Sequence, residues 1–365
     1  MGDENTANSK RLFSLDALRG LDMILLTVVA PLVNAAQRGW KCFPDSFMHQ
    51  FNHYWCGFTL FDIIMPLFIF MCGAAIPLAL EKRLAAGGGF WRHVIGRVAL
   101  LWVAGGLVQG DWITLDPLSI SPFSNTLQSI AVGYLVVAAV LYARKNILAI
   151  VVPVVCAVVY TVSLAAYGDY DKFGNLAYKI DISILGAVLP TGNRWVENPS
   201  YYTWFFTSLM FVVMAFAGYH ATRILQRVEG GWRKAGALAL YGAGFLAVGA
   251  VSLVWIPCIK PIYTLSFTSL AMGVCALLLA GLYVFNDILG YRRGWEPVLF
   301  FGRMALAAYF ISHFFRPVLK ATAELFGNGF CRYLPDSARP FVIQVFITVC
   351  LVVAMLFWRR IKAKR

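Results

Sequence analysis

Charged residues are scarce in this chain. Asp, Glu, Lys and Arg make up only 13% of its 365 residues, whereas hydrophobic residues make up 60%. A typical soluble domain is about 25% charged and about 45–50% apolar. The scarcity of charge excludes an ordinary soluble enzyme and a disordered regulator. With 8 cysteines over this length, the chain is also not a small disulfide-stapled secreted domain.

The common sequence motifs of metal and nucleotide sites are missing. Neither HExxH nor a pair of CxxC motifs occurs, so we expect no bound metal. The motifs GxxxxGK[ST], GxGxxG and GxSxG are also absent, which leaves ATP-driven transport, dinucleotide chemistry and α/β-hydrolase chemistry without local support. Cys42 and Cys56 bracket an expected outer loop, and the sequence leaves open whether they form a disulfide.

Apolar runs of about 20 residues, long enough to cross a bilayer as helices, recur along the whole chain. We therefore expect an all-α polytopic membrane protein with about ten transmembrane helices in one bundle. A polar N-terminal tail over residues 1–10 has no apolar segment of a cleavable signal peptide. A transmembrane domain over residues 11–358 and a basic C-terminal tail over residues 359–365 complete the chain. The expected spans are 17–36, 58–80, 93–110, 123–143, 146–167, 201–222, 235–256, 264–285, 297–319 and 340–358.

The net charge of +13 would suggest a nucleic-acid partner in a soluble chain. In a membrane protein, Lys and Arg concentrate in cytoplasmic segments instead. If the N-terminus is cytoplasmic, the expected inner segments carry roughly twice as many Lys and Arg residues as the outer ones. We therefore expect both termini in the cytoplasm and no nucleic-acid partner.

Ionisable residues within or beside the expected spans are functional candidates, because charge is costly inside a bilayer. Asp16 and Arg19 are three residues apart and share a helix face, so they can pair. This pair either caps the cytoplasmic end of the first span or contributes Arg19 to a basic mouth for an anionic substrate.

Two histidines lie just before the second expected span, at its outer end. His49 and His53 can exchange protons near neutral pH. Asp62, further along the chain, can orient a group at the outer end of this span or stabilise a positive charge on it. The alternative reading assigns His53 to an aromatic interfacial belt with Tyr54 and Trp55.

Taken together, five segments in order over roughly residues 11–315 resemble one family. It is the membrane acetyltransferases related to heparan-α-glucosaminide N-acetyltransferase, with their bacterial homologues. Residues 11–20, RLFSLDALRG, are similar to the family's RLxSLDxxRG start, and residues 55–73 to its WxGxTxxDLxFPxFxFxxG block. The segments similar to VLQRIALAY, KxxWTxSF and DxxGYRRW are residues 126–134, 260–267 and 287–293.

The resemblance implies about ten helices around one site, with acetyl-CoA entering from the cytoplasm and an acetyl group passing to a sugar, an amino sugar by analogy, on the far side. Residues 11–358 would then form an acyltransferase domain in the bacterial cytoplasmic membrane. The family also implies a homodimer. No metal takes part in this chemistry.

The family's catalytic histidine stands three residues before the tryptophan of its HxxWxG block. Here that position is Asn52, while His53 stands two residues before Trp55. A one-residue deletion in the loop would restore the match to His53, and His49 is the fallback. A family asparagine near the outer end of the first helix corresponds to Asn34.

In the leading hypothesis, His53 acts as general base on the acceptor or carries the acetyl group itself, and Asp62 orients it. Arg19, Arg97 and Arg303 would meet the phosphates of CoA from the cytoplasmic side, although Arg303 can equally pair with Glu296. Two other classes remain open: a transporter for a small sugar or amphiphile, and a structural subunit of an envelope-glycan assembly complex.

Overall fold

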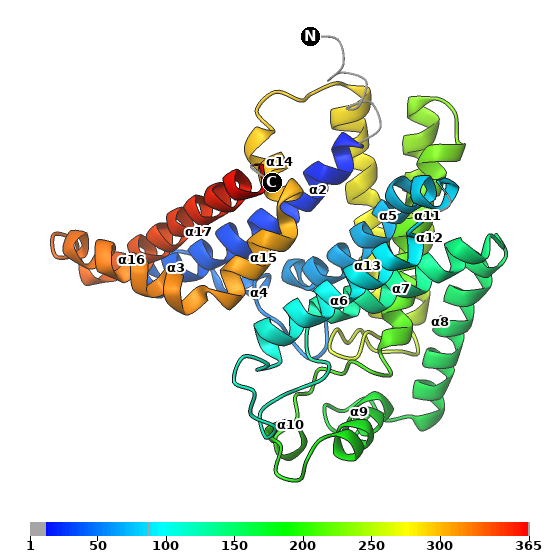
Figure 1. Ribbon diagram of the computed structural model, residues 1–365, viewed down its shortest axis with the longest axis horizontal. Coiled ribbons are helices and arrows are strands. Elements are labelled where there is room, and N and C mark those ends of the chain that lie inside the picture. The colour runs from blue at the N-terminus through cyan, green and yellow to red at the C-terminus, as the bar shows by residue number, and fades with distance from the viewer. Residues whose placement is uncertain (1–11, 87, 364–365) are drawn as a thin grey trace. The chain divides into compact units, whose positions relative to one another are not determined.

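The computed structural model describes residues 12–86 and 88–363, and within these residues the chain contains helices and no strand. The helices form two compact units (Figure 1). Unit 1 consists of residues 53–58 and 62–290, and unit 2 consists of residues 14–52, 59–61 and the chain from residue 291 onward. The expected single bundle is thus divided into two helical units. Residues 1–10 of the expected N-terminal tail lie outside the described residues.

Unit 1 contains most of the long apolar helices. A 3₁₀ turn over Leu60–Ile63 leads into α5, and α13 continues into a π-helical segment over Tyr283–Ile288. The helices of this unit are α5 (Ile64–Ala85), α6 (Phe90–Gln109), α7 (Thr126–Ala143), α8 (Leu148–Tyr167), α9 (Leu176–Val188), α10 (Arg194–Glu197), α11 (Ser208–Arg227), α12 (Gly231–Ser252) and α13 (Leu265–Leu282).

The start of α7 illustrates how local sequence fixes a helix end. Asn125 is its N-cap, and the side-chain oxygen of Asn125 accepts a hydrogen bond from the Leu127 amide at 2.8 Å. The Gln128 side chain in turn accepts one from the Asn125 amide at 3.2 Å. This capping box satisfies amides that would otherwise lack a partner in the first turn.

The core of unit 1 depends on close approach between α5 and α11. A side chain at Gly73 would collide with the Ala215 carbonyl, and one at Gly218 would collide with the Phe70 carbonyl. The Thr222 hydroxyl also donates to the Ala74 carbonyl at 2.8 Å. Small residues let helix backbones meet where apolar lipid supplies little drive for association, so these glycines set the spacing of the two helices.

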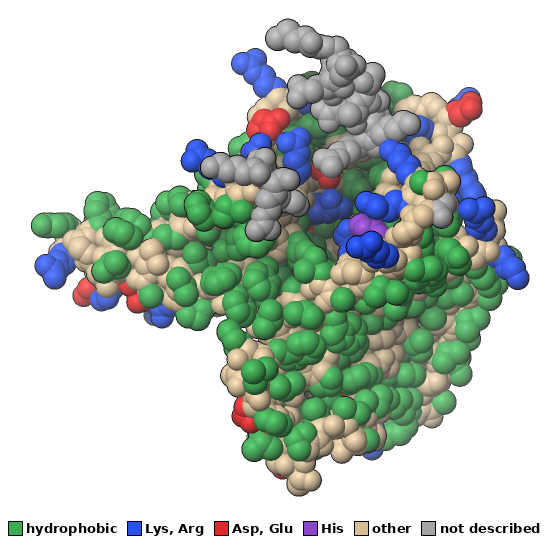
Figure 2. All heavy atoms as spheres, viewed as in Figure 1, with side chains coloured by type: hydrophobic (Ala, Val, Ile, Leu, Met, Phe, Trp, Pro, Cys, Tyr) green, Lys and Arg blue, Asp and Glu red, His purple; other side chains and the backbone are tan. Residues whose placement is uncertain are grey.

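The flank of unit 1 is apolar and exposed, as expected for a surface that faces lipid. In α8, Ile150, Val154 and Val158 are each more than half exposed. Figure 2 shows a nearly continuous hydrophobic flank on this unit, with Lys and Arg side chains above it in the view. Exposed apolar surface of this extent marks an interaction with a membrane or a partner.

Within the described residues, seven helices are long and apolar enough to cross a membrane, and the bent pair of α14 (Glu296–Arg303) and α15 (Ala305–Phe314) would make eight. They support a helical membrane protein. Helices also cover the other two expected spans: residues 13–40 form one nearly continuous helix, and α6 covers all but the last residue of 93–110. The count of ten and the location of the termini remain predictions.

Unit 2 departs most from the expected segmentation. Instead of one span over 297–319, the chain bends by 74° between α14 and α15. A further helix, α16, covers the end of that expected span and continues through residues 320–331, which we expected to form an outer loop. Residues 359–363 of the expected basic tail continue α17. The helices of unit 2 are α2 (Phe13–Ile24), α3 (Ala30–Trp40), α4 (Asp45–His49), α14 (Glu296–Arg303), α15 (Ala305–Phe314), α16 (Arg316–Cys331) and α17 (Arg339–Ala363), with a π-helical segment (Leu25–Val29) joining α2 to α3.

Candidate active site

His53 and Asp62 form a hydrogen-bonded pair in unit 1. Nδ1 of His53 lies 2.7 Å from Oδ1 of Asp62. The Asp62 side chain is 1% exposed, whereas the His53 side chain is 35% exposed. Because a carboxylate only accepts hydrogen bonds, this contact assigns the proton to Nδ1 and leaves Nε2 as the basic nitrogen.

A third residue, Lys260, completes this cluster from the loop between α12 and α13. Its Nζ lies 3.2 Å from the same Oδ1 of Asp62 and 3.1 Å from Nδ1 of His53. An ammonium group can only donate, so its hydrogen bond goes to the carboxylate and not to a protonated Nδ1. Nζ also lies 3.5 Å from Nε2 of His53. Burial lowers the pKa of Lys260 to about 8, while the negative charge of Asp62 acts in the opposite direction.

Asp62 is placed where a buried carboxylate is best tolerated. It sits in the 3₁₀ turn immediately before α5, where the positive end of the helix dipole favours negative charge. Lys260 then balances that charge in a buried ion pair. The resulting cluster combines a buried ion pair with a histidine whose side chain is 35% exposed. We call His53, Asp62 and Lys260 the histidine cluster.

The loop that carries Lys260 is held by its own polar groups. The Thr264 hydroxyl donates to the Pro257 carbonyl at 2.9 Å and accepts from the Ile259 amide at 3.1 Å. The Gly57 amide donates to the Cys258 carbonyl at 2.9 Å. This last bond ties the His53 segment to the Lys260 loop, which fixes the two parts of the cluster relative to each other.

Aromatic side chains follow His53 at the same end of unit 1. The indole nitrogen of Trp55 donates to the Tyr170 carbonyl at 3.1 Å, and its ring meets that of Tyr201 edge-on with centroids 5.9 Å apart. The ammonium of Lys172 lies 5.6 Å from the centroid of Tyr201. Burial raises the pKa of Tyr202, and the charge of Asp62 adds to this effect. Half-buried aromatic faces therefore lie near the cluster.

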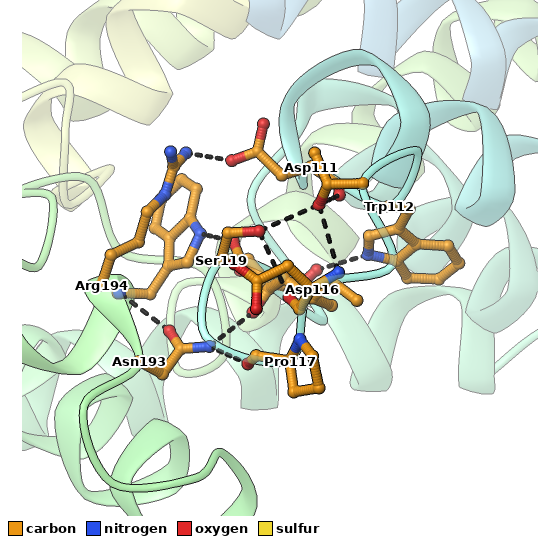
Figure 3. A network of polar contacts seen from close by, with 11 residues as sticks. Asp111, Trp112, Asp116, Pro117, Ser119, Asn193 and Arg194 are labelled. Atoms are coloured by element: carbon orange, nitrogen blue, oxygen red, sulfur yellow. Dashed lines mark hydrogen bonds and ion pairs between the residues drawn. The ribbon is translucent and has the colours of Figure 1, made fainter.

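The connections around α9 and α10 are fastened by a separate polar network (Figure 3). The side-chain amide of Asn193 donates to the Pro117 carbonyl at 2.7 Å, and Arg194 forms an ion pair with Asp111. The Arg194 amide donates to the Leu118 carbonyl at 2.8 Å. The network joins two long connections into one polar cap on unit 1.

Asp181, in α9, anchors the start of α11. Its carboxylate accepts from the backbone amides of Trp204 at 2.5 Å, Phe205 at 3.2 Å and Phe206 at 3.3 Å. Burial raises the pKa of Asp181 to about 6, against the lowering effect of these amides. A buried carboxyl at this position makes the junction sensitive to pH.

The other candidate catalytic residues belong to unit 2. His49 ends α4 and is exposed, and Asn34 is half-buried in α3. The structure therefore brings His53 and Asp62 together within one unit, while His49 and Asn34 are part of the other unit. Lys260 belongs to the segment 260–267 that is similar to KxxWTxSF, but it is not among the site residues predicted from the sequence. Its position between apolar residues in an otherwise polar-poor loop was the signal that it is buried.

The three candidate phosphate-binding arginines are spread over the two units. Arg19 pairs with Asp16 at 3.2 Å, which confirms the expected ion pair. In unit 1, the guanidinium of Arg97 lies 5.0 Å from the centroid of Tyr134. Arg303 is exposed at the end of α14, and among the described residues no ion pair joins it to Glu296.

Arg19 and Arg303 lie on two closely packed helices of unit 2. A side chain at Gly20 would collide with the Val298 carbonyl, and one at Gly302 would collide with the Asp16 carbonyl. Because each glycine is the chain neighbour of one of these arginines, the crossing of α2 and α14 holds both cations in one region of unit 2.

Comparison with known protein families supplies one match. A domain of unknown function (DUF5009) matches residues 11–104. That segment includes α2, the His53 segment and α5. No curated protein sequence matches the chain. Within the described residues, no group of three or more His, Cys, Asp or Glu side chains is arranged to hold a metal ion.

Proposed function

We propose that this chain is a transmembrane acetyltransferase that moves an acetyl group from cytoplasmic acetyl-CoA to a sugar acceptor, an amino sugar by analogy, at the outer face. The observation that carries the proposal is the hydrogen bond between Nδ1 of His53 and Asp62. A half-exposed imidazole whose other nitrogen is oriented by a buried carboxylate is suited to proton transfer.

In the direct route, Nε2 of His53 removes a proton from the acceptor amine or hydroxyl as that group attacks the thioester carbonyl. The new bond joins the acetyl carbon to the acceptor, and the carbon–sulfur bond breaks. The CoA thiolate then takes the proton from the imidazolium. Asp62 stabilises the transient positive charge on His53, and Lys260 keeps the carboxylate ionised by balancing its buried charge.

A two-step route uses the same cluster. Nε2 attacks the thioester and CoA leaves, so His53 carries the acetyl group until the acceptor displaces it. Rapid-quench experiments with labelled acetyl-CoA and no acceptor distinguish the routes. A burst of protein-bound acetyl label, absent in His53→Ala, supports the two-step route, and its absence with normal turnover supports the direct one.

The sidedness of the reaction follows from the distribution of positive charge. Both termini are proposed to be cytoplasmic, so the start of α5 and the histidine cluster lie towards the outer face. The proposal assigns the chain to the bacterial cytoplasmic membrane. A C-terminal reporter that is active only in the cytoplasm supports this orientation, and one that is active only on the outer face contradicts it.

Arg19, Arg97 and Arg303 are the proposed contacts for the phosphates of CoA. Replacing each by glutamine is expected to raise KM for acetyl-CoA by about tenfold with little change in kcat, because charge-assisted hydrogen bonds to an ionised group contribute about 1.5–3 kcal/mol. An unchanged KM in all three variants would exclude this role. A homodimer, implied by the family resemblance, is tested by the mass of the detergent-solubilised protein.

Acceptor recognition is proposed to use the aromatic side chains near the cluster. Tyr54 and Tyr201 are more than one-third exposed, and their flat faces can cover the apolar face of a sugar ring. Transfer of labelled acetyl groups to a panel of amino sugars tests the function. Uptake of the same sugars into vesicles, without acetyl transfer, would instead identify a transporter.

A further inference from the structure

Unit 1 contains a cavity at the opposite end of α5 from the histidine cluster. Its volume is about 510 Å³, and it is lined by the ends of α5, α7 and α11 and the beginning of α8. Because α5 runs for 22 residues from the Asp62 turn to this cavity, the two sites are about 33 Å apart along the helix. The cavity is therefore separate from the proposed catalytic chemistry.

The cavity carries an excess of positive charge. Arg144, Lys145 and Arg223 line it together with a single carboxylate, Glu81. Arg144 and Lys145 are exposed, and neither has an acidic partner among the described residues. Figure 2 shows Lys and Arg side chains gathered at this end of the unit, above its hydrophobic flank. We call this site the basic cavity.

One wall of the basic cavity is preorganised. Arg223 forms an ion pair with Glu81, and its Nε donates to the Tyr219 hydroxyl at 3.1 Å. The guanidinium also lies 5.3 Å from the centroid of the Tyr219 ring. Arg223 is thus held in place by partners on two helices. The unpaired cations, Arg144 and Lys145, are the ones left to meet a ligand.

The turn between α7 and α8 brings these two cations into the cavity. Arg144 caps α7 with a left-handed backbone (φ 54°), a conformation in which glycine is usual. Asn146 and Ala149, at the beginning of α8, also line the cavity. The N-terminal end of this 20-residue helix adds partial positive charge. Arg144 thus carries a long side chain at a backbone position where glycine is usual, which is consistent with a role for that side chain in the basic cavity.

The neighbouring surface indicates what kind of anion fits. Ala149 of α8 lines the cavity, and the residues that follow it on this helix, Ile150, Val151 and Val154, are exposed. A ligand with a negatively charged head and apolar tails can satisfy both features at once. Basic pockets between helices on the cytoplasmic side of a membrane are typical sites for anionic lipid headgroups.

We propose that the basic cavity binds the phosphate group of an anionic phospholipid of the inner leaflet. Arg144 and Lys145 donate to the phosphate oxygens, Arg223 and Tyr219 form the fixed wall, and the acyl chains lie along α8. The choice of the inner leaflet rests on the proposed orientation with both termini in the cytoplasm. The assignment does not depend on acetyl transfer, and the test below uses no enzymatic activity.

The test measures binding of dioctanoyl phosphatidylglycerol to the purified full-length protein in a neutral detergent, with dioctanoyl phosphatidylcholine as the reference lipid. We expect saturable binding of the anionic lipid alone. Each cation near a membrane surface contributes about a fivefold change in affinity, so the double variant R144Q/K145Q is expected to raise Kd by roughly 25-fold. Thermal melting checks that the variant is folded.

The matched control removes two cations at the same end of the unit but outside the cavity, Lys82 and Arg92. The variant K82Q/R92Q is expected to leave Kd unchanged. Equal weakening by both double variants would overturn the proposal in favour of general surface charge. Arg144→Lys keeps the charge and is expected to retain binding within a few-fold.

Two soluble probes distinguish the sources of the phosphate. Inorganic phosphate and CoA are titrated against bound phosphatidylglycerol. Displacement by neither at millimolar concentration supports the lipid assignment. Specific binding of CoA with the same dependence on Arg144 and Lys145, and no binding of phosphatidylglycerol, would overturn it and assign the cavity to a soluble ligand. Native mass spectrometry of the extracted wild-type protein supplies an independent readout, a retained lipid of phosphatidylglycerol mass.

Discussion

Nδ1 of His53 lies 2.7 Å from Oδ1 of Asp62, although the two residues are nine positions apart in the chain and only the histidine reaches the surface. The turn before α5 buries the carboxylate, and the segment before it folds back so that the imidazole lies against it. The contact fixes which nitrogen of His53 carries the proton. This relationship is the basis of the proposed chemistry, and the first prediction addresses it.

Asp62→Asn is expected to lower the rate of acetyl transfer by about 100-fold or more, because an amide can present a donor to Nδ1 and favour the wrong tautomer. The same change leaves Lys260 buried without its counter-charge and is expected to cost about 3–5 kcal/mol of stability. Rates are measured with labelled acetyl-CoA, and stability by thermal melting.

The double variant D62N/K260M separates the two effects of that substitution. It removes both buried charges, so the melting temperature is expected to return towards the wild-type value while the rate stays low. Recovery of the rate together with stability would show that Asp62 acts only as a structural partner of Lys260.

The lowered pKa of Lys260 leads us to expect an alkaline limit of activity. Burial lowers its pKa to about 8, so the ammonium loses its proton above that pH and Asp62 loses its counter-charge. Acetyl transfer is therefore expected to fall above about pH 8. Lys260→Arg, which stays protonated, is expected to move this limit upward. Lys320→Arg, in unit 2, serves as the control and is expected to leave the profile unchanged. An identical limit in Lys260→Arg would contradict the assignment.

The raised pKa of Asp181 leads us to expect that the stability of the protein depends on pH. Its pKa is about 6 in the folded chain, raised from 3.8 by burial. Between these two values the folded chain binds a proton that the unfolded chain has released, so stability falls as pH rises from about 4 to about 6. The expected loss is about 3 kcal/mol. Melting curves of wild type and Asp181→Asn across this range check the prediction, and parallel curves would contradict it.

The close contact at Gly73 allows us to predict how much stability is lost when α5 and α11 are forced apart. A methyl group there would meet the Ala215 carbonyl, so Gly73→Ala is expected to destabilise the protein by about 1–3 kcal/mol. Gly96→Ala in α6 is the control, because a side chain at Gly96 meets nothing within 4 Å. Thermal melting in detergent compares them. Equal melting temperatures would show that the helices can move apart freely.

The membrane-helix character of the chain could be predicted because it depends on composition and on the length of apolar runs. The expected spans over 123–143 and 146–167 coincide closely with α7 and α8. The bend between α14 and α15 could not be predicted, because apolar residues continue on both sides of it and no proline stands at the break. Arg303, the one charge there, does not by itself indicate a bend. Likewise, α16 is amphipathic and too polar to be recognised as a span, so its residues suggested a loop.

Within the candidate site, local features could be predicted and long-range ones could not. Asp16 and Arg19 pair as their helical spacing predicts. His53 and Asp62 were both candidates because an ionisable group beside a span needs an explanation. Lys260 lies 207 residues from His53 in the chain, and no local pattern indicates which loop returns to the start of α5. The basic cavity was missed for the same reason, since its cations come from the α7–α8 turn and from α11, which are far apart in the chain.

The most direct test of the account is transfer of label from radioactive acetyl-CoA to a panel of amino sugars by the purified protein. Wild type is compared with His53→Ala and with His49→Ala, which removes the exposed histidine of α4. The account predicts transfer by wild type and by His49→Ala, and a loss of about 10²–10⁴-fold in His53→Ala with unchanged thermal melting. Undiminished transfer by His53→Ala, or no transfer by wild type to any sugar while uptake into vesicles proceeds, would contradict it.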